Sequence, residues 1–269
     1  MITAATDLYC VLGSPVSHSQ SPLVHNISFI KNKINAVYLA FEPPDIETAV
    51  LSIRTLGIKG ASVTIPFKET IIHYLDEVDP LALKIGAVNT VVNKAGRLVG
   101  YNTDCDAAVA PLISHGIQDK TICIIGAGGA GKAVAHGIAN QGGQIIITNR
   151  SKRKGAALAA EVKGRFICQD QMDTIAADVV INTTSCGMHP LQLEDLPFPA
   201  RNLIPGMVVM DVVYTPLKTK LLSIAREKGC TIIDGLSMFV AQAAAQFELW
   251  TGRKPDTQVM RDAVLKNQY

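Results

Sequence analysis

Three glycines in the middle of the chain have the types and spacing that bind the phosphates of a dinucleotide. Gly126, Gly128 and Gly131 form a GxGxxG pattern between an apolar run and a helix-forming run. The first glycine permits a tight turn, the second a close approach of the backbone to a pyrophosphate, and the third close packing of helix on strand. A bare GxGxxG is often only a glycine-rich loop, so its flanks carry the prediction of a cofactor-phosphate turn at a helix N-terminus.

The next predicted strand, residues 144–148, is followed by a cluster of positive charge. An NAD-preferring domain usually places an acidic side chain there, on the ribose 2′-hydroxyl. Arg150 follows this strand instead, and a guanidinium can bind a 2′-phosphate through paired, charge-assisted hydrogen bonds. The pattern favours NADP. Lys152, Arg153 and Lys154 can also be interpreted as a solvated first helical turn, although cations oppose the dipole at a helix N-terminus.

A lysine and several polar side chains in the first half could act on a bound substrate. Lys68 follows the predicted strand 61–65, and desolvation there would lower its pKa and suit it to proton transfer. Thr64, Asn89 and Asp104 stand near other strand ends. Each has a structural alternative: Lys68 as a solvent-facing residue, and Asp104 as a helix cap.

A loop rich in hydroxyl groups, residues 17–21, follows the first predicted strand. Ser19 and Ser21 could hold a substrate carboxylate together with the amides of the next helix. The alternative is structural, because Ser21 followed by Pro22 is also an ordinary N-cap with proline at the first helical position.

Composition bounds the class of protein. The chain has 269 residues, 48% of them hydrophobic, and a formal charge of only +2, so small molecules are more plausible partners than nucleic acid. The uncharged residues 8–30 are interrupted by prolines, and we expect neither a signal peptide nor a membrane helix. Six scattered cysteines without a CxxC pair favour reduced thiols in a cytoplasmic protein, and we predict no metal site.

The order of elements predicts an α/β protein. Short apolar runs alternate with helical runs in both halves, and the second half has the pattern of a doubly wound parallel sheet. We predict an amino-terminal α/β domain and a dinucleotide-binding domain, with residues 235–269 helical and returning to the first domain. This arrangement favours an oxidoreductase with its site in the cleft between the domains. The predicted strands are residues 8–13, 36–41, 61–65, 87–93, 97–101, 144–148, 165–168, 178–182, 207–213 and 231–233, with helices after Pro22, Pro43, Pro66 and from Asp104.

Taken together, the motifs resemble the shikimate dehydrogenase family over nearly the whole chain. Their ordered spacing is much more specific than any single motif. They are SxS at 19–21, VTxPFK at 63–68, GAVNT at 86–90, GxNTD at 100–104, the glycine turn at 126–131, NR[ST] at 149–151, NTTSCGM at 182–188, DVVYTP at 211–216 and DGLSM at 234–238, with Gln242 and Gln246.

The resemblance implies reversible, NADP-linked reduction of 3-dehydroshikimate to shikimate, a step toward chorismate and the aromatic amino acids. It implies residues 1–103 and 237–269 as the substrate-binding and catalytic domain, and 104–236 as a Rossmann-type NADP domain. Lys68 would donate the proton to the carbonyl oxygen and act as base in oxidation. Asp104 would orient the substrate and the lysine, with coupled titration.

The remaining site residues are carried over from the family by motif. Those implied for the substrate are Ser19 and Ser21 for the carboxylate, Thr64 and Asn89 for ring hydroxyls, and Tyr214 and Gln242 for the far side. Those implied for the cofactor are Gly126, Ala127, Gly128, Gly129, Ala130 and Gly131 in the phosphate turn, Asn149, Arg150, Ser151 and Lys154 at the ribose phosphate, and Gly235 and Met238 at the nicotinamide. For Met238, core packing is an equal alternative.

The sequence departs from the commoner family pattern at several positions. Gln20 stands where a basic residue is frequent, Ser62 where asparagine is frequent, and Cys105 where glycine often follows GxNTD; Asp106 adds charge near Asp104. Two rival functions stay open: a quinate- or dual-specific paralogue, and a ligand-sensing member without turnover. We expect a monomer or a homodimer.

Overall fold

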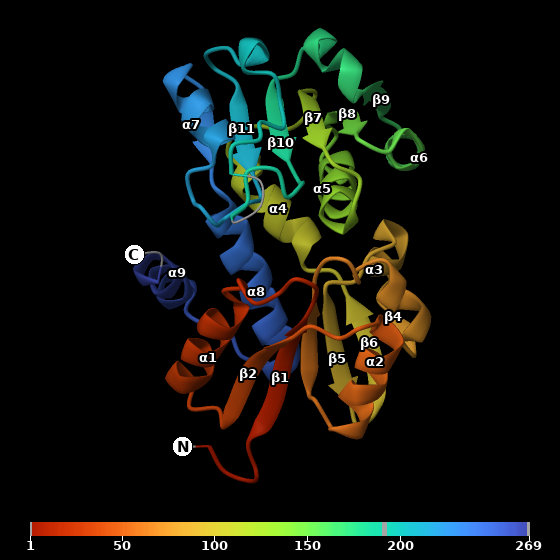
Figure 1. The fold of residues 1–269 in the computed structure, drawn as a ribbon, viewed down its shortest axis with the longest axis vertical. Helices are drawn as coiled ribbons and strands as arrows, with labels where there is room; N and C mark the ends of the chain where they lie inside the picture. The colour runs from red at the N-terminus through yellow and green to blue at the C-terminus, as the bar shows by residue number, and fades with distance from the viewer. Residues whose placement is uncertain (1, 190–192, 268–269) are drawn as a thin grey trace. The chain divides into compact units, whose positions relative to one another are not determined.

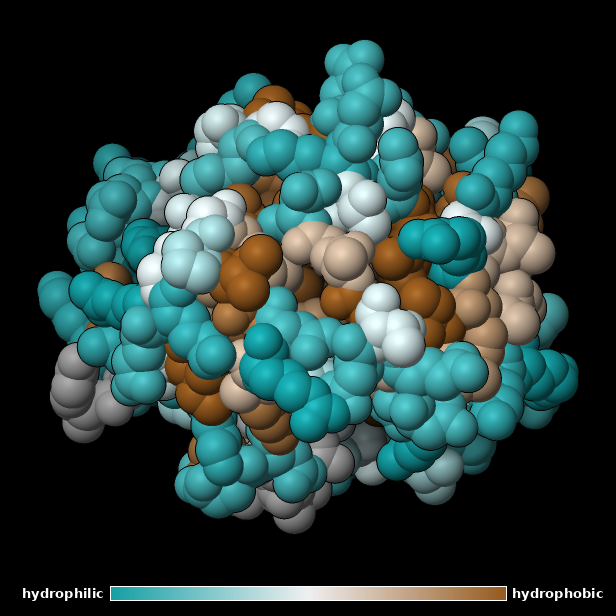
Figure 2. All heavy atoms as spheres, turned by 90° about the horizontal axis from the view of Figure 1, so that it is seen from above, coloured by the Kyte–Doolittle hydropathy of each residue, from teal (hydrophilic) through white to brown (hydrophobic). Residues whose placement is uncertain are grey.

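The computed structural model describes residues 2–189 and 193–267 (Figure 1). The chain divides into two compact units, residues 1–103 with 240–269 and residues 104–239, and each contains a six-stranded sheet. Within the described residues, no helix has the length and apolar character to cross a membrane. Figure 2 shows one face of the molecule, on which hydrophilic residues predominate and apolar residues lie in smaller groups between them.

The sheet of the first unit has the strand order β2-β1-β3-β5-β6-β4. β1, β2 and β3 are parallel, whereas β5 is antiparallel to both β3 and β6. The ends of β1, β3 and β6 therefore lie at the same edge of the sheet as the start of β5. The elements are β1 Asp7–Leu12, α1 Ser21–Lys31, β2 Ala36–Phe41, α2 Ile46–Thr55, β3 Gly60–Val63, η1 Thr70–Tyr74, β4 Glu77–Val78, α3 Pro80–Ile85, β5 Thr90–Lys94 and β6 Arg97–Tyr101.

One expectation in this unit, a helix directly after Pro66, and one structural alternative, Ser21 as an N-cap, were wrong. The segment after Pro66 forms only the short 3-10 helix η1, which begins at Thr70. Ser21 is not an N-cap: it is the first residue of α1, and Gln20 at the N-cap makes no side-chain capping bond. The Ser21 N–H instead donates to the Ser19 hydroxyl at 3.2 Å, so the local turn is stabilised by the other serine of the pair.

The outer edge of this sheet is partly covered by a side chain. Asn26 of α1 donates from Nδ2 to the Tyr38 carbonyl at 2.9 Å and accepts from the Tyr38 N–H at 2.8 Å. An edge strand otherwise presents unpaired backbone groups to other chains. The Asn26 amide thus pairs with the backbone N–H and carbonyl groups of Tyr38 in the middle of β2, where a neighbouring strand would otherwise bind.

The second unit contains a fully parallel sheet with the order β12-β11-β10-β7-β8-β9. Counted from β7, this is the 3-2-1-4-5-6 order of dinucleotide-binding folds, and it confirms the predicted doubly wound sheet. The elements are α4 Asp104–Ile113, β7 Thr121–Ile125, α5 Gly129–Asn140, β8 Gln144–Asn149, α6 Lys152–Glu161, β9 Arg165–Cys168, η2 Gln169–Thr174, β10 Val179–Asn182, η3 Ala200–Asn202, β11 Val208–Asp211, α7 Lys220–Glu227 and β12 Thr231–Ile233.

The C-terminal stretch forms two helices, α8 Gly235–Thr251 and α9 Thr257–Lys266. Gly252 ends α8 with a φ of 67°, a conformation that side chains disfavour. Asp256 then caps α9 by accepting from the N–H groups of Gln258 and Val259. The α9 helix packs against α1 in the first unit (Figure 1).

Close packing of α8 on the first sheet depends on a glycine. A Cβ atom on Gly60 would lie 2.3 Å from Trp250 Nε1, far inside contact distance. The same indole N–H donates to the Val91 carbonyl at 3.0 Å, so the ring cannot move away without losing that bond.

We therefore expect Gly60→Ala to lower the free energy of unfolding by about 1–3 kcal/mol through overpacking. Urea titrations of the wild type and the variant measure this difference. In a Trp250→Leu background, which removes the ring atoms that the new Cβ would meet, the cost of Gly60→Ala should shrink toward zero. An equal cost in both backgrounds would contradict the assignment.

Candidate active-site residues in the two units

The polar residues predicted for the substrate gather at one edge of the first sheet. Ser19 and Ser21 follow β1, Thr64 and Lys68 follow β3, and Asn89 precedes the antiparallel β5. Backbone bonds tie these segments together: the Ser14 N–H donates to Ile65 O at 2.9 Å, and the Val88 N–H donates to Lys68 O at 2.8 Å. The topology thus places side chains far apart in sequence along one edge.

The serine loop is held by an acidic side chain that sequence reasoning missed. Glu42, just after β2, accepts from the backbone N–H groups of Val16 at 2.6 Å and Ser17 at 3.1 Å through a single carboxylate oxygen. The loop is anchored at its other end by Asn267, whose Nδ2 donates to Gln20 Oε1 at 3.0 Å. The one sequence signal was an acidic residue at the end of the strand beside β1.

The segment with Thr64 and Lys68 makes a tight turn at the end of β3. The Thr64 N–H donates to Leu12 O and the Phe67 N–H donates to Thr64 O, both at 2.9 Å. Phe67 is buried in the core of the unit, and its neighbour Lys68 is half-buried. The buried ring anchors the turn, so the backbone that carries the lysine is fixed.

Asn89 is buried, with 2% of its surface exposed, and its side-chain amide is held by two threonines. Its Oδ1 accepts from the Thr103 N–H at 2.8 Å and from the Thr90 hydroxyl at 2.7 Å, while its Nδ2 donates to Thr103 Oγ1 at 2.9 Å. Thr103 in turn donates to the carbonyl of Gln242 on α8 at 3.3 Å. Sequence reasoning had assigned Thr90 and Thr103 no role. Asp104 follows Thr103 directly and is buried in the first turn of α4.

The glycine turn of the second unit has the geometry that its spacing predicts. Gly126 has a φ of 114°, and a Cβ on Gly131 would lie 2.4 Å from Gly126 O. A Cβ on Gly128, in contrast, would meet nothing within 4 Å. Gly128 is also the N-cap of α5 and has no side chain, so no capping side chain accepts from the first amides of this helix.

The basic segment after β8 is exposed. Asn149 Nδ2 donates to Ser151 O at 3.0 Å, and the Ser151 hydroxyl caps α6 by accepting from the Lys154 N–H at 3.4 Å. Arg150 is exposed, and no carboxylate in the described part of the chain pairs with it. Ser151 therefore has an observed structural role, and Arg150 is available for an anion.

Tyr214, predicted for the far side of the substrate, and Gly235 and Met238, predicted for the nicotinamide, also have packing roles. Tyr214 stacks on Phe239 with ring centroids 4.3 Å apart. A Cβ on Gly235 would lie 2.5 Å from Val212 O, so glycine is needed where α8 begins beside the end of β11. Met238 is buried, with 6% of its surface exposed. The contacts of Tyr214 with the substrate and of Gly235 and Met238 with the cofactor stay predictions.

A buried carboxylate organises the loop that leads to Tyr214. Asp211 accepts from Asn182 Nδ2 at 2.9 Å, from the Val213 N–H at 3.0 Å and from the Thr219 hydroxyl at 2.7 Å. Burial raises the pKa of the Asp211 carboxyl to about 6, although these three hydrogen bonds lower it. The ends of β10 and β11 are thus joined through one titratable group.

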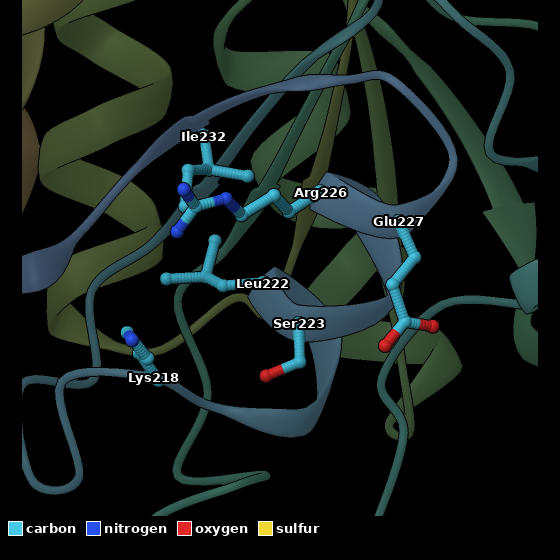
Figure 3. Close-up of a pocket in the computed structure, with 6 residues that line it drawn as sticks. All are labelled: Lys218, Leu222, Ser223, Arg226, Glu227 and Ile232. Atoms are coloured by element: carbon cyan, nitrogen blue, oxygen red, sulfur yellow. The ribbon is translucent and has the colours of Figure 1, made fainter.

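A surface hollow in the second unit has a different location (Figure 3). It encloses about 320 Å³ beside α7 and β12, and none of the predicted site residues lines it. Its lining includes the apolar Leu222 and Ile232, with the Arg226 side chain drawn between them, and the basic Lys218.

Comparison with known proteins identifies the family. Three family models match: the shikimate dehydrogenase substrate binding domain over residues 11–91, shikimate / quinate 5-dehydrogenase over 108–211, and the shikimate 5′-dehydrogenase C-terminal domain over 235–265. The shikimate dehydrogenase (NADP(+)) of Moorella thermoacetica is 44% identical over 98% of this chain and 94% of its own length. The chain belongs to the shikimate dehydrogenase family.

Solved structures of shikimate dehydrogenases have the same fold. One in complex with NADP⁺ matches with a TM-score of 0.92 at 39% identity, over 100% of this chain and 98% of its own. The shikimate 5-dehydrogenase of Thermus thermophilus, in complex with NADP(H) and shikimate, matches with a TM-score of 0.88 at 34% identity, over 97% and 99%.

The second unit of this shikimate dehydrogenase family member fits the phosphates of NADP. The open space beside Gly128 and the N-terminus of α5 suit a pyrophosphate, because the N-cap residue offers those amides no side-chain acceptor. Arg150 presents an exposed positive charge after β8, and among the described residues no carboxylate pairs with it.

The Asp211 carboxyl makes the stability of the protein depend on pH. Its pKa is raised on folding, so between about pH 4 and pH 6 the folded state binds more protons than the unfolded state, and stability falls as pH rises. We expect the unfolding free energy of Asp211→Asn, relative to wild type, to rise by up to about 3 kcal/mol from pH 4 to pH 7. Urea titrations across this range, with exposed Asp170→Asn as control, measure it. Parallel pH curves for Asp211→Asn and wild type would refute the assignment.

Proposed function

We propose that this chain catalyses the reversible, NADPH-linked reduction of 3-dehydroshikimate to shikimate on the route to aromatic amino acids. The observation that carries the proposal is the set of hydroxyl, amide and amine groups gathered at one sheet edge of the first unit. The supporting family evidence is the 44% identity to a shikimate dehydrogenase (NADP(+)) over almost the whole chain.

In the proposed binding mode, short polar side chains at the sheet edge recognise the substrate. Ser19 and Ser21 donate hydroxyl hydrogen bonds to the carboxylate, and Thr64 and Asn89 contact ring hydroxyls. Tyr214 and Gln242 close the far side. Glu42 accepts from the backbone N–H groups of Val16 and Ser17, so the start of the serine loop is fixed before the substrate arrives.

In the proposed chemical step, Lys68 transfers the proton and Asp104 orients the reacting groups. NADPH, when bound, supplies the hydride that adds to the ketone carbon. Lys68 Nζ donates a proton to the carbonyl oxygen, which becomes the hydroxyl of shikimate, and neutral Lys68 accepts that proton in oxidation. Asp104 orients the hydroxyl and the lysine.

The proposed cofactor site lies at the carboxyl ends of β7 and β8. The backbone from Gly126 to Gly131 binds the pyrophosphate, with Ala127, Gly129 and Ala130 between the glycines. Asn149, Arg150, Ser151 and Lys154 surround the 2′-phosphate, and Gly235 and Met238 face the nicotinamide. We infer a cytoplasmic location from six free cysteines, and a monomer or homodimer stays a prediction.

The function is tested by initial rates with shikimate or quinate, each with NADP or NAD. We expect shikimate with NADP to be preferred, whereas a quinate-specific enzyme would prefer quinate and a ligand-sensing protein would show no turnover.

Arg150→Ala should raise the KM for NADP by roughly ten- to a hundredfold, because a charge-assisted bond is lost, and should leave the KM for NAD nearly unchanged. Exposed Lys152→Ala is the matched control. Equal changes for both cofactors would rule out a 2′-phosphate contact.

The proton-transfer role is tested by Lys68→Met, which keeps the apolar stem and deletes the amine. We expect kcat to fall about 10²–10⁴-fold, the usual share of general acid–base catalysis, with little change in the Kd of shikimate or NADP. Rates at saturation and equilibrium titrations separate the two effects, and Lys84→Met on α3 is an exposed control. A saturated rate within a few-fold of wild type would sink the catalytic role.

A further inference from the structure

A chain of buried hydrogen bonds crosses the first unit from β2 to the start of β5. The Tyr38 hydroxyl donates to Ser62 Oγ at 2.6 Å, and Ser62 Oγ donates to Gln246 Oε1 at 2.6 Å. Gln246 Nε2 then donates to Asn89 O at 3.2 Å. None of the four residues is more than 5% exposed. Because water does not reach these groups, each bond that is broken leaves a buried polar atom unsatisfied.

At the β2 end of this series of hydrogen bonds, Tyr38 packs against an uncharged side chain. The ring of His25 stacks on Tyr38 with centroids 4.5 Å apart. Burial lowers the pKa of His25 to about 3, and the neighbouring Gln246 amide offsets only part of that shift. The imidazole is therefore uncharged at neutral pH and serves as a flat wall against which the tyrosine is packed.

At the β5 end of this series, Asn89 is held by hydrogen bonds to both its backbone carbonyl and its side-chain amide. The Asn89 carbonyl accepts from Gln246 and, at 2.7 Å, from the Val63 N–H, while the side-chain amide is held by Thr90 and Thr103. Removing Gln246 would release one of the two bonds to that carbonyl, next to the side chain assigned to a ring hydroxyl.

The serine at position 62 is what completes the connection. A hydroxyl can accept one hydrogen bond and donate another along the same line, as Ser62 does between Tyr38 and Gln246. The asparagine that is frequent here in the family is larger, and Ser62 is 5% exposed among packed neighbours. Ser62 and Gln246, 184 residues apart, thus act as a pair in this chain.

We infer that Gln246, with Ser62 as its partner, is a positioning residue that presets Asn89 for the substrate. The inference rests on the proposed function. The energy of ordering Asn89 is spent during folding, so substrate binding does not have to supply it. Gln246 touches no reacting atom, and its effect is on the KM of the substrate rather than on the chemical step.

The same helix offers a matched control one turn further on. Trp250 Nε1 donates to Val91 O at 3.0 Å, just as Gln246 Nε2 donates to Asn89 O. Both bonds join α8 to the backbone at the start of β5, but Val91 is two residues beyond Asn89. If the two bonds only stabilise the fold, losing either one should change the KM for shikimate to a similar extent. If Gln246 positions Asn89, only the loss of the Gln246 bond should raise that KM.

The experiment compares Gln246→Met, Ser62→Ala, the double variant and Trp250→Phe. We expect Gln246→Met to raise the KM for shikimate about tenfold, with kcat within about threefold and the KM for NADP within about twofold. Ser62→Ala should act in the same direction, and the double variant should change KM by less than the product of the single changes, because both break one chain. Trp250→Phe should lower the urea midpoint with shikimate KM within about twofold.

Equal KM changes in Gln246→Met and Trp250→Phe, an unchanged KM in Gln246→Met, or independent effects in the double variant would each overturn the positioning role. If Gln246→Met does not fold, Ser62→Ala and Gln246→Glu decide the question by the same KM criterion. Wild-type turnover of shikimate is measured first: its absence overturns the proposed function, whereas normal wild-type turnover with an unaffected Gln246 variant overturns only this inference.

Discussion

Backbone carbonyl groups at the start of β5 accept hydrogen bonds from two α8 side chains one helical turn apart. Gln246 binds the carbonyl of Asn89 and Trp250 that of Val91. A buried donor that loses its acceptor costs about 1–3 kcal/mol, so the two side-chain N–H groups hold helix and strand in a single register. The sheet edge with the predicted substrate residues begins at that same point, and Gly60 makes the approach possible because it has no side chain.

Local sequence patterns predicted most of the sheet strands because each is a short apolar run bounded by turn residues. Residues 36–41, 165–168 and 231–233 match strands without adjustment. The errors occur where structure is short or interrupted. The 3-10 helix η1 has no hydrophobic period to detect, and the predicted C-terminal helical stretch is divided where Gly252 adopts a positive φ.

The sequence predicted those parts of the site that are built from neighbouring residues in the chain, but not the contacts between distant segments. The glycine turn is read from six consecutive positions, and its conformation follows from them. The structural alternative for Ser21, an N-cap, was wrong because the Ser-Pro pair permits either register, and only the fold shows that Ser19 accepts the bond. The bonds of Glu42 to the serine loop and of Gln246 to Ser62 join segments that sequence spacing does not relate. The roles of Lys68, Asp104 and Arg150 stay predictions.

The face of α8 that carries Gln242, Gln246 and Trp250 also limits how this gene can change in length. Each of these residues is four positions from the next, so they lie in one row along the helix. One codon inserted between Gln242 and Trp250 would turn everything after it by about 100°, since the helix has 3.6 residues per turn. The indole would then leave both Gly60 and Val91. The number of residues between Gln242 and Trp250 is therefore fixed by these contacts, whereas the connection at residues 252–256 lies beyond them.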